Sequence, residues 1–281
     1  MEGILFVLNP IAGGGRAKEL EALIDKEMED NHIDYEIAVT TEPYEATEIV
    51  RLSKYDMIVA VGGDGTVNEV AKGIIKRGHG TMGIIPGGTG NDLSRSLDIP
   101  LDPKEALECL LKCSAKKLDV CTANGYYFFN ISSIGFDAEV VNRAAKIKHV
   151  IKGQVAYLLS VLYTLIVYRN KKALIRVDGV EYNTNMLLLA VGNGKYYGGG
   201  FYIMPNSKVD DNKLHACIIS DASKPVLLAL FPTIFKGTHL KYTKYVHTVA
   251  AKHITIETED NLFFNLDGEI LDAGKRIDFK V

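Results

Sequence analysis

Short runs rich in apolar residues alternate with helical patterns along residues 1–120. The runs predict buried strands at 4–8, 35–39, 57–61 and 82–85. Apolar residues recur at helical spacing in 18–30, 45–52, 67–76 and 103–112. This order predicts an α/β domain over residues 1–120, with a doubly wound, mostly parallel sheet in a three-layer arrangement.

The pattern changes after Asp119. Asn124-Gly125 predicts a hairpin turn between strands at 118–120 and 126–129. A helical region, about 137–168, follows, and from Ala173 onward short strands are separated by turns. Those turns are Asp178-Gly179, Gly198 to Gly200, Asp210 to Asn212 and Asp267-Gly268. We expect a second, β-rich domain over 121–281, an antiparallel sandwich whose last strand could return to the first domain, with a cleft between the two.

Three glycine-rich loops each follow a predicted strand of the first domain. They are Asn9 to Arg16, Gly62 to Gly65, and Pro86 to Asp92. Glycine lets the backbone approach a ligand closely and permits positive φ, and a helix N-terminus favours an anion. The glycines could also be explained by three unrelated tight turns between strands and helices. One shared phosphate site explains them better, because the carboxyl ends of parallel strands meet at one edge of a sheet.

Carboxylates in and near these loops suggest a metal, because Mg²⁺ prefers carboxylates, phosphate oxygens and water. Asp64 lies in the second loop, Asp92 ends the third, and Asp119 lies at the domain boundary. Asp92 could instead cap the helix that begins at Leu93, and Asp119 could be a solvated strand residue. Spacing alone makes Glu269 an exposed residue of the Asp267-Gly268 hairpin.

Composition narrows the class of protein. The chain is 47% hydrophobic and 24% charged, and its net charge of −3 gives no broad reason to bind nucleic acid. The N-terminus lacks the basic region of a secretion signal. The longest apolar run, 155–168, is shorter than the ~20 residues of a membrane span. We expect a cytoplasmic protein.

Several motifs together resemble one enzyme family. They are Asn9-Pro10 with Gly13, Gly62 to Glu69, Pro86 to Asp92, Ile134 to Ala138, Gly192 to Gly194, Tyr197 to Gly200, Val209 to Asp211, and Asp267 to Glu269. With them, essentially the whole chain resembles the diacylglycerol kinase catalytic-domain family, in its bacterial soluble branch, whose members are lipid kinases. Gly-Gly-Asp-Gly-Thr alone is shared with NAD kinases, whereas the extension Val67-Asn68-Glu69 is similar to the lipid kinases.

The resemblance implies roles that spacing does not assign. Residues implied to contact ATP are Asn9, Pro10, Ile11, Ala12, Gly13, Thr40, Gly63, Asp64, Gly65, Thr66, Val67, Asn68, Glu69 and Thr89. Asp64, Asp92 and Asp119 are implied to organise a catalytic Mg²⁺, and Glu269 to take the proton from the lipid hydroxyl. Lys208, Asp211 and Lys213 match a structural Mg²⁺ site, the two lysines through their carbonyls. The family commonly has glycine where this chain has Asn212, but Asn also adopts left-handed geometry.

Two apolar segments suggest how the protein reaches a lipid. Residues 155–168 could line an acyl-chain channel, or could be a helix buried between sheet and domain interface. Residues 226–236, with Lys236, Lys241 and Lys244, could lie on an anionic membrane, or could be a core helix. We therefore expect transient membrane association, and a homodimer could form along an edge of the β-rich domain.

The sequence as a whole predicts an ATP- and Mg²⁺-dependent kinase of a lipid hydroxyl, with diacylglycerol as acceptor and phosphatidic acid as product. Two alternatives stay open. The acceptor could be a soluble hydroxyl compound such as NAD, or the protein could be a regulator that binds nucleotide or lipid without turnover.

Overall fold

The computed structural model forms two compact units, residues 1–117 and 118–281. It describes residues 3–11, 14–15, 17–112, 114–136, 139–140, 161, 163–164, 167–220 and 222–281. Most of the helical region expected at 137–168, and with it the possible acyl-chain channel at 155–168, lies outside the described residues.

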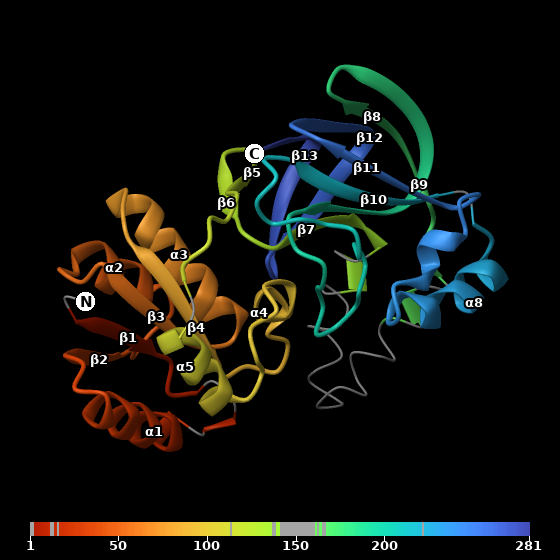
Figure 1. Ribbon diagram of the computed structural model, residues 1–281. Helices are drawn as coiled ribbons and strands as arrows, with labels where there is room; N and C mark the ends of the chain where they lie inside the picture. Colours follow the sequence, from red (N-terminus) through yellow and green to blue (C-terminus); the bar gives the residue numbers. More distant parts are fainter. Residues whose placement is uncertain are drawn as a thin grey trace. The chain divides into compact units, whose positions relative to one another are not determined.

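The first unit contains a four-stranded parallel sheet in the order β2-β1-β3-β4. The strands are β1 (Ile4–Leu8), β2 (Tyr35–Val39), β3 (Met57–Gly62) and β4 (Thr81–Pro86). The helices are α1 (Ala17–Asp30), α2 (Glu45–Leu52), α3 (Asp64–Arg77), α4 (Asp92–Ser96) and α5 (Pro103–Lys112). Helices α1 and α5 cover one face of the sheet, and α2 and α3 cover the other (Figure 1).

Strand residues alternate between the two covered faces. Ile4, Phe6 and Leu8 of β1 share a core cluster with Ile24 of α1 and Leu107 of α5. The intervening strand residues are buried as well, because helices pack on both sides of the sheet. The doubly wound, three-layer α/β fold expected from the sequence is thereby confirmed.

Helix α3 begins at Asp64, three residues before the start expected at 67. Gly63 is its N-cap residue in an extended conformation (φ −89°), so the glycine loop runs directly into the first helical turn. At the other end Gly78 adopts φ 81° and its amide donates to the carbonyls of Ile74 and Ile75, which closes the helix.

The second unit is built on a nine-stranded antiparallel sheet. Its strands are β5 (Cys121–Ala123), β6 (Tyr126–Phe128), β7 (Ile131–Gly135), β8 (Lys171–Val177), β9 (Val180–Gly192), β10 (Leu214–Ser220), β11 (Val246–Ala251), β12 (His253–Leu266) and β13 (Glu269–Lys280). The order is β11-β10-β9-β7-β12-β13-β5-β6, and β8 pairs with both β9 and β12. The β-rich, antiparallel character of this region is confirmed.

Local turn signals worked well in this unit. Asn124-Gly125 forms the predicted hairpin turn, although its first strand is β5 and not residues 118–120. Asp178, Asn212 and Asp267 all adopt positive φ. The last strand, β13, pairs with β12 and β5, so it belongs to this sheet and does not return to the parallel sheet of the first unit.

The sheet of the second unit has a core on each face. One core cluster joins residues from both ends of the sheet, including Phe128 of β6 and Ala216 of β10, as the layers of a sandwich do. The other face is covered by α8 (Lys224–Ile234) and the 3₁₀ helix η2 (Thr238–Lys241). Among the residues that the structure describes, no helix is long and apolar enough to cross a bilayer.

Candidate active site

The second and third glycine loops touch each other backbone to backbone. The Gly87 amide donates to the Gly62 carbonyl at 2.8 Å. A Cβ on Gly88 would lie 2.4 Å from Gly63 Cα, and one on Gly63 would lie 3.1 Å from Gly88 Cα. Neither glycine has positive φ, so the left-handed freedom of glycine is not used at these two positions. Close approach is the reason for glycine here.

The first glycine loop contacts the second through Asn9. The backbone amide of Asn9 donates to the Val61 carbonyl at 3.1 Å, and the Asn9 Nδ2 donates to Thr66 Oγ1 at 3.3 Å. The Asn9 Oδ1 accepts the Ile11 amide at 3.1 Å. β1 and β3 are neighbours in the sheet, with the crossovers leaving in opposite directions, so this link sits at the topological switch point. Open α/β sheets bind ligands at such a point.

Asp64 connects the second loop to the helix that follows the third. Its Oδ1 accepts the Asp92 amide at 2.7 Å and the Leu93 amide at 3.4 Å. The carboxylate therefore lies at the N-terminus of α4. The N-cap position of α4 is Asn91, in left-handed geometry (φ 52°), and Asp92 is the first helical residue. The capping role considered for Asp92 is therefore wrong, and its side chain is buried.

The N-terminus of α3 is suited to an anion. Glycine at the N-cap leaves the first turn without a side-chain cap. The first backbone amides of a helix have no partner within the helix, and the helix dipole favours an anion beside them. The side chains of Val67 and Asn68 are buried, and the Val67 amide donates to Gly63 O at 3.1 Å. These two residues hold the helix in place.

The other residues implied to contact ATP lie around the same edge. The Thr40 amide donates to Leu8 O at 2.9 Å, directly after β2. Glu69 is half-buried, and its carbonyl accepts Thr47 Oγ1 at 2.9 Å. Thr89 and Ile11 are exposed at their loop tips. Pro10 and Gly65 belong to the same loops, whereas Ala12 and Gly13 lie outside the described residues.

In the second unit, Asp267 anchors the turn that carries Glu269. Its carboxylate accepts three consecutive backbone amides, those of Phe129 (2.8 Å), Asn130 (3.1 Å) and Ile131 (3.0 Å). Asn265 Oδ1 accepts the Gly268 amide at 2.8 Å within the turn. Glu269 is the first residue of β13 and is exposed. The hairpin therefore presents this glutamate on a rigidly fixed turn.

Asp119 also belongs to the second unit, where it is tied to the loop around residue 210. Its amide donates to Val209 O at 2.8 Å, its Oδ2 accepts the Asn212 amide, and its carbonyl accepts Asn193 Nδ2 at 2.6 Å. Asn212 adopts φ 56°, the left-handed geometry considered for this asparagine in place of the family's glycine. The structure places Asp119 in this network and Asp64 with Asp92 in the first unit.

The loop proposed for a structural metal fits a cation at one atom. Asp211 Oδ1 is buried and accepts no hydrogen bond, whereas Oδ2 lies 3.1 Å from His215 Nε2. Lys208 and Lys213 flank it with exposed side chains, so a metal contact from either would use the carbonyl. Within the described ranges no three His, Cys, Asp or Glu side chains gather as a metal cluster.

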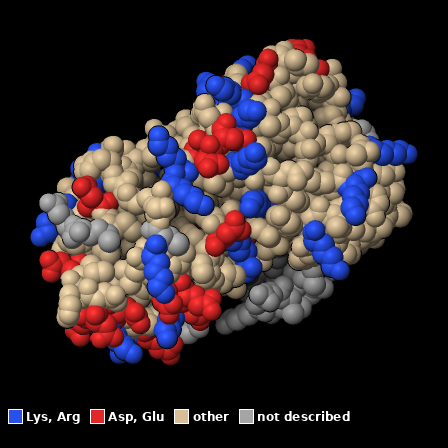
Figure 2. Space-filling view, in the orientation of Figure 1, with Lys and Arg blue, Asp and Glu red and all other residues tan. Residues whose placement is uncertain are grey.

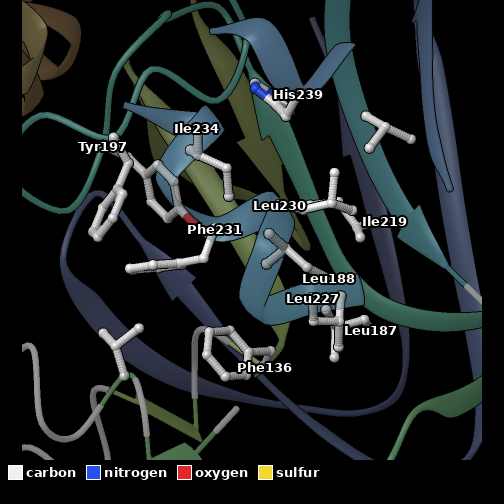
Figure 3. Close-up of a pocket in the computed structure, with 13 residues that line it drawn as sticks. Phe136, Leu187, Leu188, Tyr197, Ile219, Leu227, Leu230, Phe231, Ile234 and His239 are labelled. Carbon is white, nitrogen blue, oxygen red and sulfur yellow. The ribbon is translucent and has the colours of Figure 1, made fainter. Parts of the chain in front are cut away.

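An apolar cavity of about 40 Å³ lies between α8 and the sheet of the second unit (Figure 3). Phe136, Leu188, Phe231 and Ile234 are among its lining residues, and His239 supplies a polar ring. Burial lowers the pKa of His239, so this ring is neutral near pH 7. The cavity has room for a few water-sized groups.

Comparison with known families agrees with this architecture. Residues 3–123 match the model of the diacylglycerol kinase catalytic domain. Residues 130–275 match the YegS C-terminal NAD kinase beta sandwich-like domain. The fold and loops therefore define a two-domain kinase of the lipid-kinase type.

Individual relatives cover nearly the whole chain. A protein of Pseudomonas aeruginosa named "Probable lipid kinase YegS-like" is 30% identical over 282 residues, covering 99% of this chain and 91% of its own. The diacylglycerol kinase of Bacillus subtilis is 28% identical, covering 96% and 90%. A crystal structure of a diacylglycerol kinase from Bacillus anthracis superposes with a TM-score of 0.81 at 33% identity, covering 99% and 94%. The chain belongs to the diacylglycerol kinase catalytic-domain family of bacterial lipid kinases.

Sequence reasoning missed the residues that position others. Asn193 holds Asp119, and Asn130 O accepts the amides of Asn193 and Gly194 at 3.0 Å each. Gly192 is required because a Cβ there would lie 2.2 Å from Asn130 O. The signal was present as Gly192-Asn193-Gly194, but its partners are more than 60 residues away along the chain.

Proposed function

We propose that this kinase transfers the γ-phosphate of ATP to the hydroxyl of diacylglycerol, giving phosphatidic acid for phospholipid metabolism at the cytoplasmic face of a membrane. The observation that carries the proposal is the hydrogen bond from the Asp92 amide to Asp64. It joins the same two loops that are in backbone contact at Gly63 and Gly88. It sets the Asp64 carboxylate beside the N-terminus of α3, whose first turn has no side-chain cap, and this is the combination that a nucleotide phosphate with its cation requires.

In this proposal the loops of the first unit bind ATP. Backbone amides of Gly63, Gly65 and Thr66 face the phosphates, and Asn9 orients the loop through Thr66. The remaining contacts come from Pro10 to Gly13, Thr40, Val67 to Glu69, and Thr89. Backbone donors suit this task because they are fixed before the ligand arrives and cost no reorganisation during transfer.

Magnesium is also part of the proposal. Asp64, Asp92 and Asp119 would hold the catalytic ion, and Asp211 with the carbonyls of Lys208 and Lys213 would hold a structural one. The buried Asp211 Oδ1, which accepts no hydrogen bond, fits such an ion. When bound, the catalytic ion neutralises charge on the transferring phosphoryl group.

Glu269 is the proposed general base. Its carboxylate accepts the proton of the lipid hydroxyl while that oxygen forms its bond to the γ-phosphorus and the bond to ADP breaks. The turn anchored by Asp267 restricts the position of Glu269. Such positioning matters because proton transfer requires the base within hydrogen-bond reach of the hydroxyl.

The decisive experiment uses an unbiased acceptor pool. The protein is incubated with γ-labelled ATP, Mg²⁺ and a total lipid extract, and labelled lipids are identified by mass. We expect labelled phosphatidic acid. A different labelled lipid would keep the kinase assignment but exclude diacylglycerol as the acceptor, and labelled water-soluble products alone would exclude a lipid acceptor.

One observation favours a second acceptor class. The family model that matches residues 130–275 is named for its likeness to NAD kinase. The same incubation with NAD tests a soluble acceptor, and labelled NADP would support it.

A homodimer is a separate part of the proposal. It would form along β6 or β11, the strands at the ends of the second sheet, and sedimentation at several protein concentrations would detect it.

A further inference from the structure

Helix α8 is apolar on its outer side as well as its inner side. From Pro225 to Phe235 the sequence contains no charged residue. Leu227 and Leu230 are buried against the sheet, whereas Leu228 is 44% exposed and Phe235, just after the helix, is 50% exposed. A helix on the surface of a soluble domain ordinarily turns a polar face to water. The outer face of α8 therefore lacks the side chains that water would favour.

The segment around α8 is basic and free of acid. Residues 222–256 contain no Asp or Glu, although the chain has 35 acidic residues in 281. Lys236, Lys241 and Lys244 in this segment are exposed. In Figure 2, which has the orientation of Figure 1, the surface over α8 shows basic and uncharged side chains. Exposed lysines thus follow the exposed apolar helix in a segment that contains no acidic residue.

Aromatic rings hold the exposed apolar residues in place. The Phe235 ring lies 4.8 Å from that of Phe201 and 5.7 Å from that of Phe231. Tyr242 is 46% exposed, and Lys244 Nζ lies 5.3 Å from the ring centre of Tyr245. Exposed Phe and Tyr between lysines are typical of a membrane–water interface. Because the Phe235 ring is packed against two other rings, its exposure is a fixed feature of the surface.

We propose that this α8 surface, formed by Leu228, Phe235, Lys236, Lys241, Tyr242 and Lys244, docks on an anionic phospholipid bilayer. The inference rests on the proposed lipid acceptor, which would be reached from such a bilayer. A second copy of this chain fits less well, since a symmetric pair would place lysines against lysines without acidic partners. A bilayer offers both apolar depth and negative charge.

The test is flotation with vesicles of phosphatidylcholine, with and without phosphatidylglycerol. The variant replaces Lys236, Lys241 and Lys244 by Ala, and the control replaces the exposed Lys26, Lys104 and Lys112 of the first unit by Ala. Wild type and control should float with the anionic vesicles. Since a lysine near such a surface contributes about fivefold to partitioning, the variant should bind roughly a hundredfold more weakly. Phe235→Ser should weaken binding without changing its salt dependence.

Equal flotation of the variant and the wild type would overturn the proposal, as would equal binding to both kinds of vesicle. Dimers in the absence of vesicles that dissociate in Phe235→Ser would show a second copy as the occupant instead. Circular dichroism confirms that each variant is folded. Activity on a dispersed short-chain diacylglycerol separates the two proposals. The lysine variant should retain activity on this dispersed substrate. If the wild type lacked that activity, the proposed acceptor would be in doubt, and the flotation result would remain valid.

Discussion

The glycine loops of the first unit and the Asp267 turn of the second both hold candidate functional groups in position, but they do so by different contacts. The loops fix functional groups by backbone contact, with Gly63 against Gly88. The turn fixes Glu269 through one side chain that accepts three amides from another strand region. The first device tolerates no added atom, and the second depends on a single carboxylate. Substitutions in the two units should therefore differ in how strongly they affect turnover and how strongly they affect the stability of the fold.

The largest effect is expected for Asp64→Asn. The amide oxygen can still accept the Asp92 amide, so the fold should remain, whereas the negative charge proposed to hold Mg²⁺ is lost. Turnover should fall roughly a thousandfold, about 4 kcal/mol in barrier. Steady-state kinetics at several Mg²⁺ concentrations measures the loss of turnover, and urea unfolding shows whether the fold remains. If wild type were equally active with and without Mg²⁺, the metal assignment would fail.

Asp267→Ala should damage the second unit by about 3 kcal/mol, since three buried amides lose a charged acceptor. Asp178→Ala provides a matched control. Asp178 also begins an Asp-Gly turn and accepts the amides of Lys252 and His253, but it is exposed. The control should cost about 1 kcal/mol. Unfolding by urea compares them, and equal losses would contradict the special role of the 267 turn.

Glu269→Gln should leave ATP binding nearly intact and lower turnover roughly a hundredfold. Glu259→Gln, at an exposed position of β12, is the control and should retain full turnover. Calorimetric ATP titration and initial rates test the two parts separately. Unchanged turnover in Glu269→Gln would remove this residue from the role of base.

Gly88→Ala should cost about 2 kcal/mol of unfolding free energy, because its Cβ would lie 2.4 Å from the backbone of Gly63. Gly65→Ala meets no atom within 4 Å and lies in the first turn of α3, so stability should be unchanged or slightly higher. A similar loss in both variants would show that the contact between loops is not what requires glycine.

The smallest effect concerns acid. Burial lowers the pKa of His239 below its ordinary value of 6.5 in the folded state. The unfolded chain therefore binds the extra proton first, and stability is lost as pH falls below 6.5 toward the lowered pKa, by at most about 1.4 kcal/mol per pH unit. The His residues described in the first unit, His32 and His79, are exposed. His239→Gln should flatten this slope. An unchanged slope would assign the acid sensitivity elsewhere.

Local sequence signals predicted most of the fold. Every strand of the first unit was placed within one residue at each end, because buried parallel strands are short apolar runs. The turns at Asn124, Asp178 and Asp267 were also predicted, since Asn-Gly and Asp-Gly favour left-handed geometry. The start of α3 was missed because Gly63 and Asp64 look like loop residues until the helix amides are seen.

The candidate site was predictable only in part. The three loops were grouped correctly because they follow neighbouring strands. The capping role of Asp92 was not decidable, since Asp and Asn are both good N-cap residues and only the backbone shows that Asn91 takes the position. The exposed outer face of α8 was equally undecidable, because an apolar helix in sequence is ordinarily a buried one.

Local patterns along the chain specify where the backbone is extended, helical or turning, and where glycines cluster at strand ends, because these properties depend on neighbouring residues alone. Tertiary structure decided what each of these features touches. Gly63 lies against Gly88, Asp64 bonds to a residue 28 positions later, and Asp267 bonds to amides 136 to 138 positions earlier. Such contacts arise from the packing of whole sheets, so no local pattern encodes them.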